Sequence, residues 1–449
     1  MKLNFSSFLK TKEKKGITAI FHTLHPYPIY INTKAWGRLT METNNKKGNE
    51  VLIKSLQEQG LIIKSYRDDI KELQKIQMTY KRKISQMTNL YLVLTHKCNL
   101  ECQYCFVSQS FTEKERKVIM TPDIAKRGID LWAKHIKRNI VKDNNYLIIF
   151  YGGEPLMNLL TLQTSLEYIQ ELQDKKHLPQ ENLEKVIITN GTLINAKISK
   201  LLKKYCVGVT ISIDGTNEIH DAYRIDKKGQ GSFKQAKKAI KILQSEKIDI
   251  YASVTVTPYN IELIKEIPRL LNKMGIKELG LNMLVAKTPF LVKPNILIKE
   301  YYKQATQEMI KTFSSARKIK IHEAKLGIKV DAFTQQEFYP PDCMAYGGQI
   351  VVQPNGLISP CHANSKYNIR HIENWDKNLL IQDTSIVKKW RKRLPLYNEK
   401  CLKCEAISIC GGGCLWSTEE IGESPMKKDK ASCIYTKEAF KFIVWDSYK

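Results

Sequence analysis

Short apolar runs alternate with amphipathic stretches six times between residues 91 and 285, and this alternation limits the fold more than any other feature. The amphipathic stretches have helical spacing, and the first of them has Thr121 as its cap and Pro122 in its first position. Strands that alternate with helices form a parallel sheet with right-handed crossovers. Six units are too few for a closed eight-stranded barrel, so we expect an α/β fold with a partial (β/α)6 barrel. The predicted strands are residues 91–95, 146–151, 186–189, 207–213, 250–256 and 279–285.

The cysteines divide the rest of the chain. None of the eleven precedes Cys98, three fall within 98–105, and seven lie between residues 343 and 433. The N-terminus has no apolar segment of signal-peptide length, so we expect a cytoplasmic protein. In the cytoplasm, this number of cysteines points to metal binding rather than to disulfides. The lone Cys206 beside a predicted strand is expected in the core. The predicted domains are residues 1–85, 86–329 and 330–449.

The first region predicts a small winged-helix-like module. Its apolar runs at 17–21, 29–32 and 61–63 favour strands, and residues 49–59 have helical spacing before Gly60. Residues 68–87, rich in Lys and Gln, predict a helical linker.

The charge balance favours an anionic partner. With 72 Lys and Arg against 45 Asp and Glu, the chain carries +27, which suits an acidic peptide, nucleic acid or a membrane surface. The lysines are scattered without interleaved aromatic residues, which argues against nucleic acid and fits a lysine-rich background on solvated faces. The longest apolar run, 146–151, is too short to cross a membrane, so we expect no membrane partner.

The motif with the clearest chemistry is Cys98-x3-Cys102-x2-Cys105, directly after the first predicted strand. In parallel sheets the functional loops follow the C-terminal ends of strands. Three thiolates on one loop can hold a [4Fe–4S] cluster and leave one iron open. The alternative is a zinc site with His96 as the fourth ligand.

This spacing, with the aromatic Tyr104 before the last cysteine, resembles the signature of the radical S-adenosylmethionine (radical SAM) superfamily. The resemblance implies that Cys98, Cys102 and Cys105 are catalytic, and that the open iron chelates the methionine moiety of S-adenosyl-L-methionine. One electron, from a donor such as flavodoxin or ferredoxin, would release a 5′-deoxyadenosyl radical that takes hydrogen from an unactivated carbon.

The resemblance also implies cofactor contacts at the later strand ends. Gly152-Gly153-Glu154 resembles the element that holds the methionine amino group. Hydroxyl and carboxylate groups at strand ends suit the ribose, and Arg224 suits the methionine carboxylate. A structural ion pair between Asp214 and Arg224 is the alternative for these two residues. The predicted cofactor-binding residues are Tyr104, Gly152, Gly153, Glu154, Asn190, Ser212, Asp214 and Arg224.

The seven C-terminal cysteines resemble the SPASM extension of these enzymes, which holds auxiliary clusters. The resemblance implies an inner cluster with three cysteines and an outer cluster with four, so three [4Fe–4S] clusters are expected in total. No cysteine lies between Cys343 and Cys361, so the inner cluster would keep an open iron or borrow a ligand. Structural zinc knuckles are the alternative, but seven ligands do not make two closed tetrahedra. The inner set is Cys343, Cys361 and Cys414, and the outer set is Cys401, Cys404, Cys410 and Cys433.

Three functions compete within this resemblance. The first is a maturase that installs a crosslink, foremost a thioether but also a C–C or C–O bond, in a ribosomally synthesised precursor peptide. Residues 1–85 would then bind the leader as an added strand and present the core peptide. The second is an anaerobic sulfatase-maturating, formylglycine-generating enzyme, although such enzymes begin nearer the cysteine motif. The third is a non-catalytic iron–sulfur or zinc scaffold that binds nucleic acid.

Overall fold

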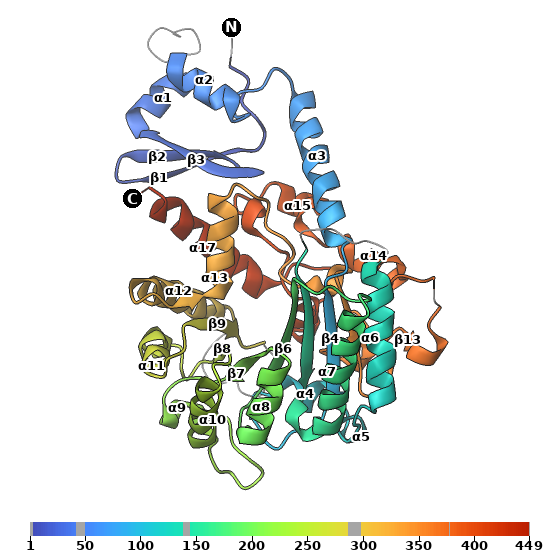
Figure 1. The fold of residues 1–449 in the computed structure, drawn as a ribbon. Coiled ribbons are helices and arrows are strands. Elements are labelled where there is room, and N and C mark those ends of the chain that lie inside the picture. Colours follow the sequence, from blue (N-terminus) through green and yellow to red (C-terminus); the bar gives the residue numbers. More distant parts are fainter. Residues whose placement is uncertain (1–2, 42–49, 138–143, 286–297, 377, 449) are drawn as a thin grey trace.

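A computed structural model describes residues 3–41, 50–137, 144–285, 298–376 and 378–448 of the chain. A three-stranded sheet with its helices lies at one end of the molecule and a large parallel sheet at the other (Figure 1). Among these residues no helix has both the length and the apolar character that crossing a bilayer requires.

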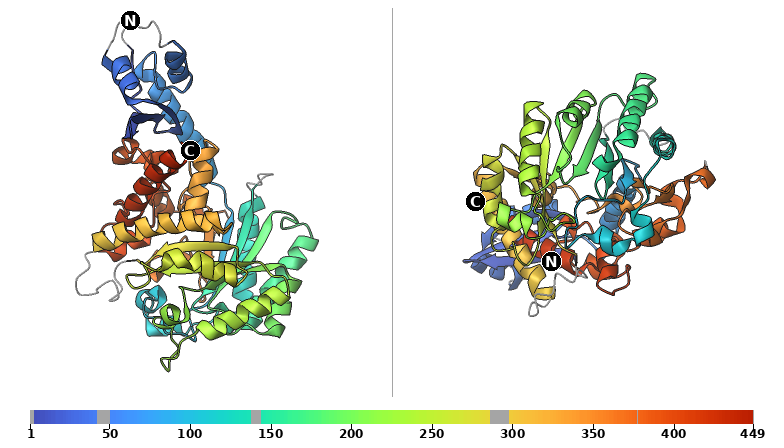
Figure 2. Two further views of the ribbon diagram at one scale, coloured as in Figure 1. Left: turned by 90° about the vertical axis from the view of Figure 1, so that its left-hand side faces the viewer. Right: turned by 90° about the horizontal axis from the view of Figure 1, so that it is seen from below.

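The large sheet confirms the predicted α/β fold. Its six central strands are parallel, and each pairs with the next strand along the chain. Helices cover the outer face of this curved sheet, which gives the partial barrel seen from below in Figure 2. The central strands are β4 (Asn89–Thr95), β5 (Tyr146–Gly152), β6 (Leu183–Thr189), β7 (Val207–Ser212), β8 (Ile250–Val256) and β9 (Glu278–Met283). The connecting helices are α6 (Pro122–Lys137), α7 (Leu159–Asp174), α8 (Ala196–Lys204), α9 (Asn217–Asp221), α10 (Phe233–Ser245) and α11 (Ile267–Lys273).

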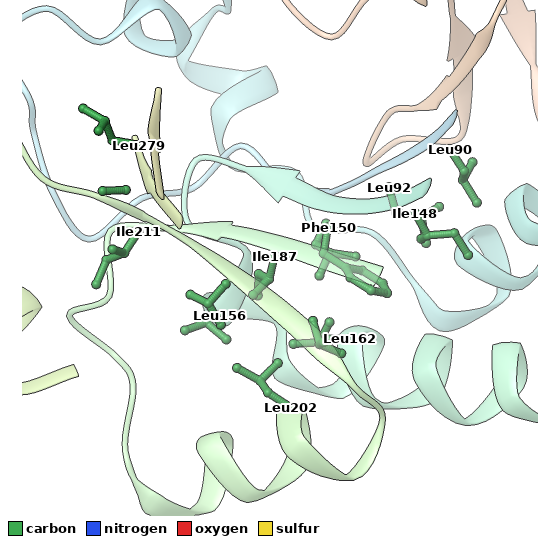
Figure 3. Packing of buried hydrophobic residues seen from close by; sticks show 14 of the residues in the cluster. Leu90, Leu92, Ile148, Phe150, Leu156, Leu162, Ile187, Leu202, Ile211 and Leu279 are labelled. Atoms are coloured by element: carbon green, nitrogen blue, oxygen red, sulfur yellow. The ribbon is translucent and has the colours of Figure 1, made fainter. Parts of the chain in front are cut away.

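The core of the barrel lies between the sheet and these helices (Figure 3). Alternate residues of each strand point outward, so that Leu90 and Leu92 of β4 and Ile148 and Phe150 of β5 are fully buried. They pack with helix residues such as Leu162. The residues between them in the strands face the interior of the partial barrel, where polar side chains are tolerated.

Short strands, one from the end of the second region and three from the third, extend the sheet beyond the predicted six. Within the described residues the sheet has ten strands, because β10 (His322–Glu323) pairs with β9 and β11 (Gln349–Val352) pairs with β4. Two antiparallel strands, β12 (Leu357–Ser359) and β13 (Arg370–His371), follow β11. The predicted boundary at 329/330 falls inside helix α13 (Ala324–Thr334), so the cysteine-rich region is continuous with the sheet.

The N-terminal module contains an antiparallel sheet in the order β1-β2-β3, followed by helices. The strands β2 and β3 and the helix α2 coincide with predicted elements, whereas β1 and α1 were not expected. The strand predicted at 61–63 is wrong, because only Ile62 pairs there, in an isolated bridge with Phe5. The long helix α3 corresponds to the predicted linker and leads into β4. The elements are β1 (Leu9–Lys14), β2 (Ile17–His22), β3 (His25–Asn32), α1 (Thr33–Met41), α2 (Glu50–Glu58) and α3 (Tyr66–Ile84).

One face of this small sheet packs on the C-terminal helix α17 (Lys430–Asp446), as both Figure 1 and Figure 2 show. The ring of Phe21 lies 5.0 Å from that of Phe440, centroid to centroid. Tyr30 donates a hydrogen bond to the Val444 carbonyl. The remaining helices are α4 (Phe106–Ser110), α5 (Glu113–Arg116), α12 (Ile298–Lys318), α14 (Ser385–Arg391), α15 (Glu399–Leu402) and α16 (Leu415–Glu420).

The expectation that Cys206 is a core residue is wrong, because its side chain is exposed. Cys206 occupies the turn between α8 and β7, where its φ is +52° and its N–H donates a hydrogen bond to the Lys203 carbonyl. A residue in this left-handed turn points away from the sheet, whereas the neighbouring Val207 enters the core.

Candidate active site

The first three cysteines lie on the loop that follows β4, at the C-terminal edge of the parallel strands. Main-chain hydrogen bonds join this loop to the end of β5: the Gly153 N–H donates to the Thr95 carbonyl at 2.8 Å, and the Glu154 N–H donates to the Lys97 carbonyl at 2.8 Å. On its other side, the Glu101 N–H donates to the Ile225 carbonyl at 2.7 Å. The loop is therefore held between the end of β5 and the segment that follows α9.

Gly152 and Gly153 are required by this close approach. A Cβ atom on Gly152 would lie 2.0 Å from the Thr95 carbonyl oxygen, and one on Gly153 would lie 2.3 Å from the Lys97 carbonyl oxygen. Gly152 also has a φ of +147°, which only glycine adopts without strain. The two glycines thus allow the main chain of the cysteine loop to lie against the end of β5.

Glu154 ties the end of β5 to the end of β6. Its buried carboxylate accepts hydrogen bonds from the Thr189 hydroxyl at 2.8 Å and from the main-chain N–H groups of Leu156 and Asn190, at 3.0 and 2.9 Å. Burial raises the pKa of Glu154 to about 7, although these donors oppose the rise. The carboxylate is thus largely occupied by the chain's own donors.

Asn190 contacts the first cysteine directly. Its side-chain amide lies 3.8 Å from the Cys98 sulfur and donates to Asn99 Oδ1 at 3.1 Å. The Asn190 oxygen in turn accepts from the Thr192 N–H and hydroxyl. Sequence reasoning predicted Asn190 at this site but did not predict that Asn99 and Thr192 complete the network.

Asp214 and Arg224 form the ion pair that was the structural alternative. Arg224 Nε lies 2.8 Å from Asp214 Oδ2, and the carboxylate also accepts from the Tyr104 hydroxyl and from the Thr255 N–H. The guanidinium group lies over the Tyr104 ring and next to Cys102. Burial raises the pKa of Cys102 to about 11, and Arg224 opposes this rise. The pair uses Nε and Nη2 of Arg224. Ser212 ends β7 on the same edge, half-buried.

The C-terminal cysteines raise one another's pKa values. Burial raises the pKa of Cys414 to about 12, and the next contribution comes from Cys343; the pKa of Cys361 is raised well above its usual range by burial and by Cys343 and Cys414. Burial also raises the pKa of Cys433 to about 11, with contributions from Cys401 and Cys404. Cys433 also contributes to the raised pKa of Cys410. These contributions connect cysteines within the predicted inner set and within the predicted outer set, and the assignment of a cluster to each set stays a prediction.

Two carboxylates hold the loop that joins the two sets. Asp342 accepts from the Gly413 N–H at 2.8 Å, and Asp429 accepts from the Cys414 N–H at 2.9 Å. A Cβ atom on Gly411 would lie 2.1 Å from the Asp342 nitrogen, so the loop passes against the chain there. Neither carboxylate was predicted from the sequence. The one signal that could have pointed to Asp342 is its position beside Cys343.

Aromatic side chains separate the first site from the inner set. The His362 ring stacks on Tyr91, with centroids 5.1 Å apart, and meets Tyr151 and Phe106 edge-on. Phe106 directly follows Cys105 of the first site, and His362 directly follows Cys361 of the inner set, so their contact lies between the two cysteine groups. Burial raises the pKa of Tyr151, and both Cys105 and Cys361 add to the rise.

The cysteine groups fit the iron–sulfur clusters that the motifs imply. All eleven cysteines lie within the described ranges, and none is in a disulfide. In the described part of the chain no three His, Cys, Asp or Glu side chains converge as they would around a single ion. Cysteines that hold a cluster bind different irons and so need no common point. Asn190 and Arg224 already direct N–H donors at two of the three sulfurs of the first site.

Comparisons with known proteins identify the relatives of this chain. The pattern of the Radical SAM superfamily matches residues 92–280. The radical SAM cyclopropyl synthase TigE of Paramaledivibacter caminithermalis is 29% identical over 426 residues, which cover 87% of this chain and 81% of TigE. A cysteine-type anaerobic sulfatase-maturating enzyme of Clostridium novyi is 26% identical over 332 residues, covering 71% of this chain and 84% of that protein.

A solved structure shows the same fold. The structure of native anSMEcpe with bound AdoMet covers 80% of this chain and 98% of its own, with 18% identity and a TM-score of 0.64. Motif, strand-end geometry and relatives thus agree. The chain belongs to the radical SAM superfamily, as an enzyme that uses S-adenosylmethionine and an iron–sulfur cluster.

Proposed function

We propose that this enzyme is a peptide maturase that removes hydrogen from a ribosomally made precursor and installs a new bond in its core. The observation that carries the proposal is the extent of the match to TigE. The unmatched remainder of the chain is smaller than either residues 1–85 or residues 330–449, so the similarity reaches into both flanking regions. These are the regions to which we assign leader recognition and auxiliary clusters.

We assign the cofactor contacts residue by residue. Cys98, Cys102 and Cys105 would hold the first cluster, and the inner and outer sets would hold two more, so iron analysis should give about twelve irons per chain. Asp214 would orient Arg224 toward the methionine carboxylate, and Tyr104, Glu154 and Asn190 would fix the loop around it. Gly152, Gly153 and Ser212 would line the same edge.

When bound, the cluster and S-adenosylmethionine supply hydrogen abstraction from an unactivated carbon. The protein's part is to orient the cofactor and the core peptide and to exclude water. The rings of Tyr91, Tyr151, Phe106 and His362 lie between the first site and the inner set, where a core peptide would reach both groups.

The new bond is foremost a thioether, as the three-cysteine inner set would leave room for a substrate thiolate. The name of TigE adds a carbon ring as the second candidate. Both products lose two hydrogens, so intact mass alone does not separate them. A thioether needs a cysteine in the core peptide, and a cyclopropane does not.

The test incubates the reconstituted enzyme with the peptide encoded beside its gene. We expect a mass loss of two hydrogens, equimolar 5′-deoxyadenosine, and no modification by the Cys105→Ala variant. A core peptide with Cys→Ala substitutions then tells the two bonds apart. An unmodified peptide despite cofactor cleavage would contradict the proposal, and conversion of a sulfatase peptide to formylglycine would establish the alternative.

We further propose that the leader adds to the sheet edge at β3. Beside this strand lies a pocket of about 380 Å³, in which Glu58, Asp68, Asp69 and Glu72 join His22 and His25 without any Lys or Arg among the lining residues. Strand addition gives affinity through main-chain hydrogen bonds, and a neighbouring pocket gives specificity. This local charge favours a basic leader segment, although the net charge of the chain favours an acidic one.

Charge reversal tests the leader site. Glu58→Lys should weaken precursor binding about fivefold in fluorescence anisotropy, because an exposed ion pair is lost. The matched control is Glu171→Lys on α7, where Glu171 pairs with Lys175. Equal affinity of both variants would contradict this placement of the leader.

We place the enzyme in the cytoplasm, where its eleven cysteines stay reduced, with a low-potential donor such as flavodoxin or ferredoxin.

A further inference from the structure

A buried lysine lies between the two auxiliary cysteine sets. Lys329 on α13 is 2% exposed, and its ammonium group has three partners within the chain. Nζ lies 3.0 Å from Asp342 Oδ1, 2.9 Å from the Ile409 carbonyl oxygen and 3.8 Å from the centre of the Tyr339 ring. These partners use all three donors of the ammonium.

Two of these partners directly precede cysteines of different sets. Asp342 comes before Cys343 of the inner set, and Ile409 comes before Cys410 of the outer set. One side chain thereby joins the chain segments that lead into both sets. Its length and its two hydrogen bonds fix how far apart these segments lie.

Asp342 extends the connection to a third cysteine. Its N–H donates to the Gly411 carbonyl at 3.1 Å, and its second carboxylate oxygen accepts from the N–H of Gly413, the residue before Cys414. The side chain of Asp342 is 21% exposed, whereas that of Lys329 is only 3% exposed. The ammonium group is therefore the buried member of this ion pair, and a buried charge needs the full set of partners that Lys329 has.

We propose that Lys329 is a positioning residue that sets the spacing of the inner and outer auxiliary clusters and supplies the buried positive charge beside them. The proposal rests on the assignment of clusters to these cysteines. Net charge and hydrogen bonds near a cluster set its reduction potential, so the lysine would affect potential as well as assembly.

The test compares Lys329→Met with Lys83→Met after anaerobic reconstitution. Lys83 is the matched control, because it forms an exposed ion pair with Glu337 just beyond α13. We expect Lys329→Met to lose auxiliary iron, from about twelve irons per chain toward about four, while S-adenosylmethionine cleavage without peptide continues. Lys83→Met should keep the full iron content.

A double variant keeps the proposal testable if Lys329→Met does not fold. Lys329→Met with Asp342→Asn leaves no uncompensated buried charge, so folding should be retained. The Ile409 carbonyl still loses its donor, and we expect lower auxiliary iron or shifted midpoint potentials in an EPR-monitored redox titration. Wild-type iron content and potentials in the double variant would overturn the proposal. Zinc in place of iron in the wild-type protein would instead refute the cluster assignment itself, before any variant is compared.

Discussion

The polar side chains at the first cysteine site form hydrogen bonds mainly with other residues of the chain. Glu154 and Asp214 each accept hydrogen bonds from three residues of the chain, and the Asn190 amide connects Cys98 to Asn99. Their positions at strand ends were predictable, because the C-terminal ends of parallel strands meet at one edge. Their partners were not, since Thr189, Thr255 and Tyr104 come from three different elements.

The residue-scale prediction concerns His22 in the N-terminal module. Burial lowers the pKa of His22 to about 4, and the neighbouring His25 adds to this; the ring is neutral and accepts from the Leu24 N–H. Below its unfolded pKa of about 6.5 the unfolded chain takes up a proton that the folded module does not, so stability falls as the pH falls. Between pH 6.5 and 5 the loss should be about 2 kcal/mol.

Hydrogen exchange of the β2 and β3 amides at these two pH values measures the effect. The His22→Gln variant, whose amide oxygen can accept from Leu24, should lose most of the dependence. An unchanged pH dependence in this variant would show that another group is responsible.

At the scale of elements, periodicity predicted the long elements and missed the short ones. β8 begins and ends where the sequence indicated, at residues 250–256, because its apolar residues alternate over several pleats. The two to four residues of β10, β11 and β13 are too few for a pattern, and β11 pairs with β4 from far along the chain. Lys329 was missed for a related reason, because its partner Ile409 lies 80 residues further along the chain.

The contact between β5 and the cysteine loop gives the element-scale prediction. A methyl group at residue 153 would lie 2.3 Å and 2.5 Å from the carbonyl oxygens of Lys97 and His96, and neither main-chain atom can turn aside. Gly153→Ala should therefore displace the loop, at a cost of about 1–3 kcal/mol. Iron of the first site and cofactor cleavage should fall, while auxiliary iron stays.

Gly208→Ala is the control, because a Cβ atom on this β7 residue meets nothing closer than 3.8 Å. It should keep both iron content and cleavage. Wild-type cleavage by Gly153→Ala would mean that the loop does not need this approach.

At the scale of the whole molecule, the regions share cores. Residues of β2 and of helices α13 and α17 form one apolar cluster, and Phe8 and Leu24 belong to another with Tyr346 and Trp390. The sequence divides the chain by cysteine content and periodicity, which report on single segments. Shared cores depend on which faces meet, so the sequence did not show that the N-terminal module packs on the cysteine-rich region.

The last prediction follows from these shared cores. Deleting residues 1–85 would uncover Phe440 and remove the ion pair of Lys12 with Glu405, the residue after Cys404. The lost packing resembles a large core truncation, about 3–5 kcal/mol for Phe21 alone, so the melting temperature and the iron of the outer set should both fall. Glu58→Lys, which leaves these cores intact, should keep both. A truncated chain with wild-type melting temperature and about twelve irons would show instead that the module is a separable appendage.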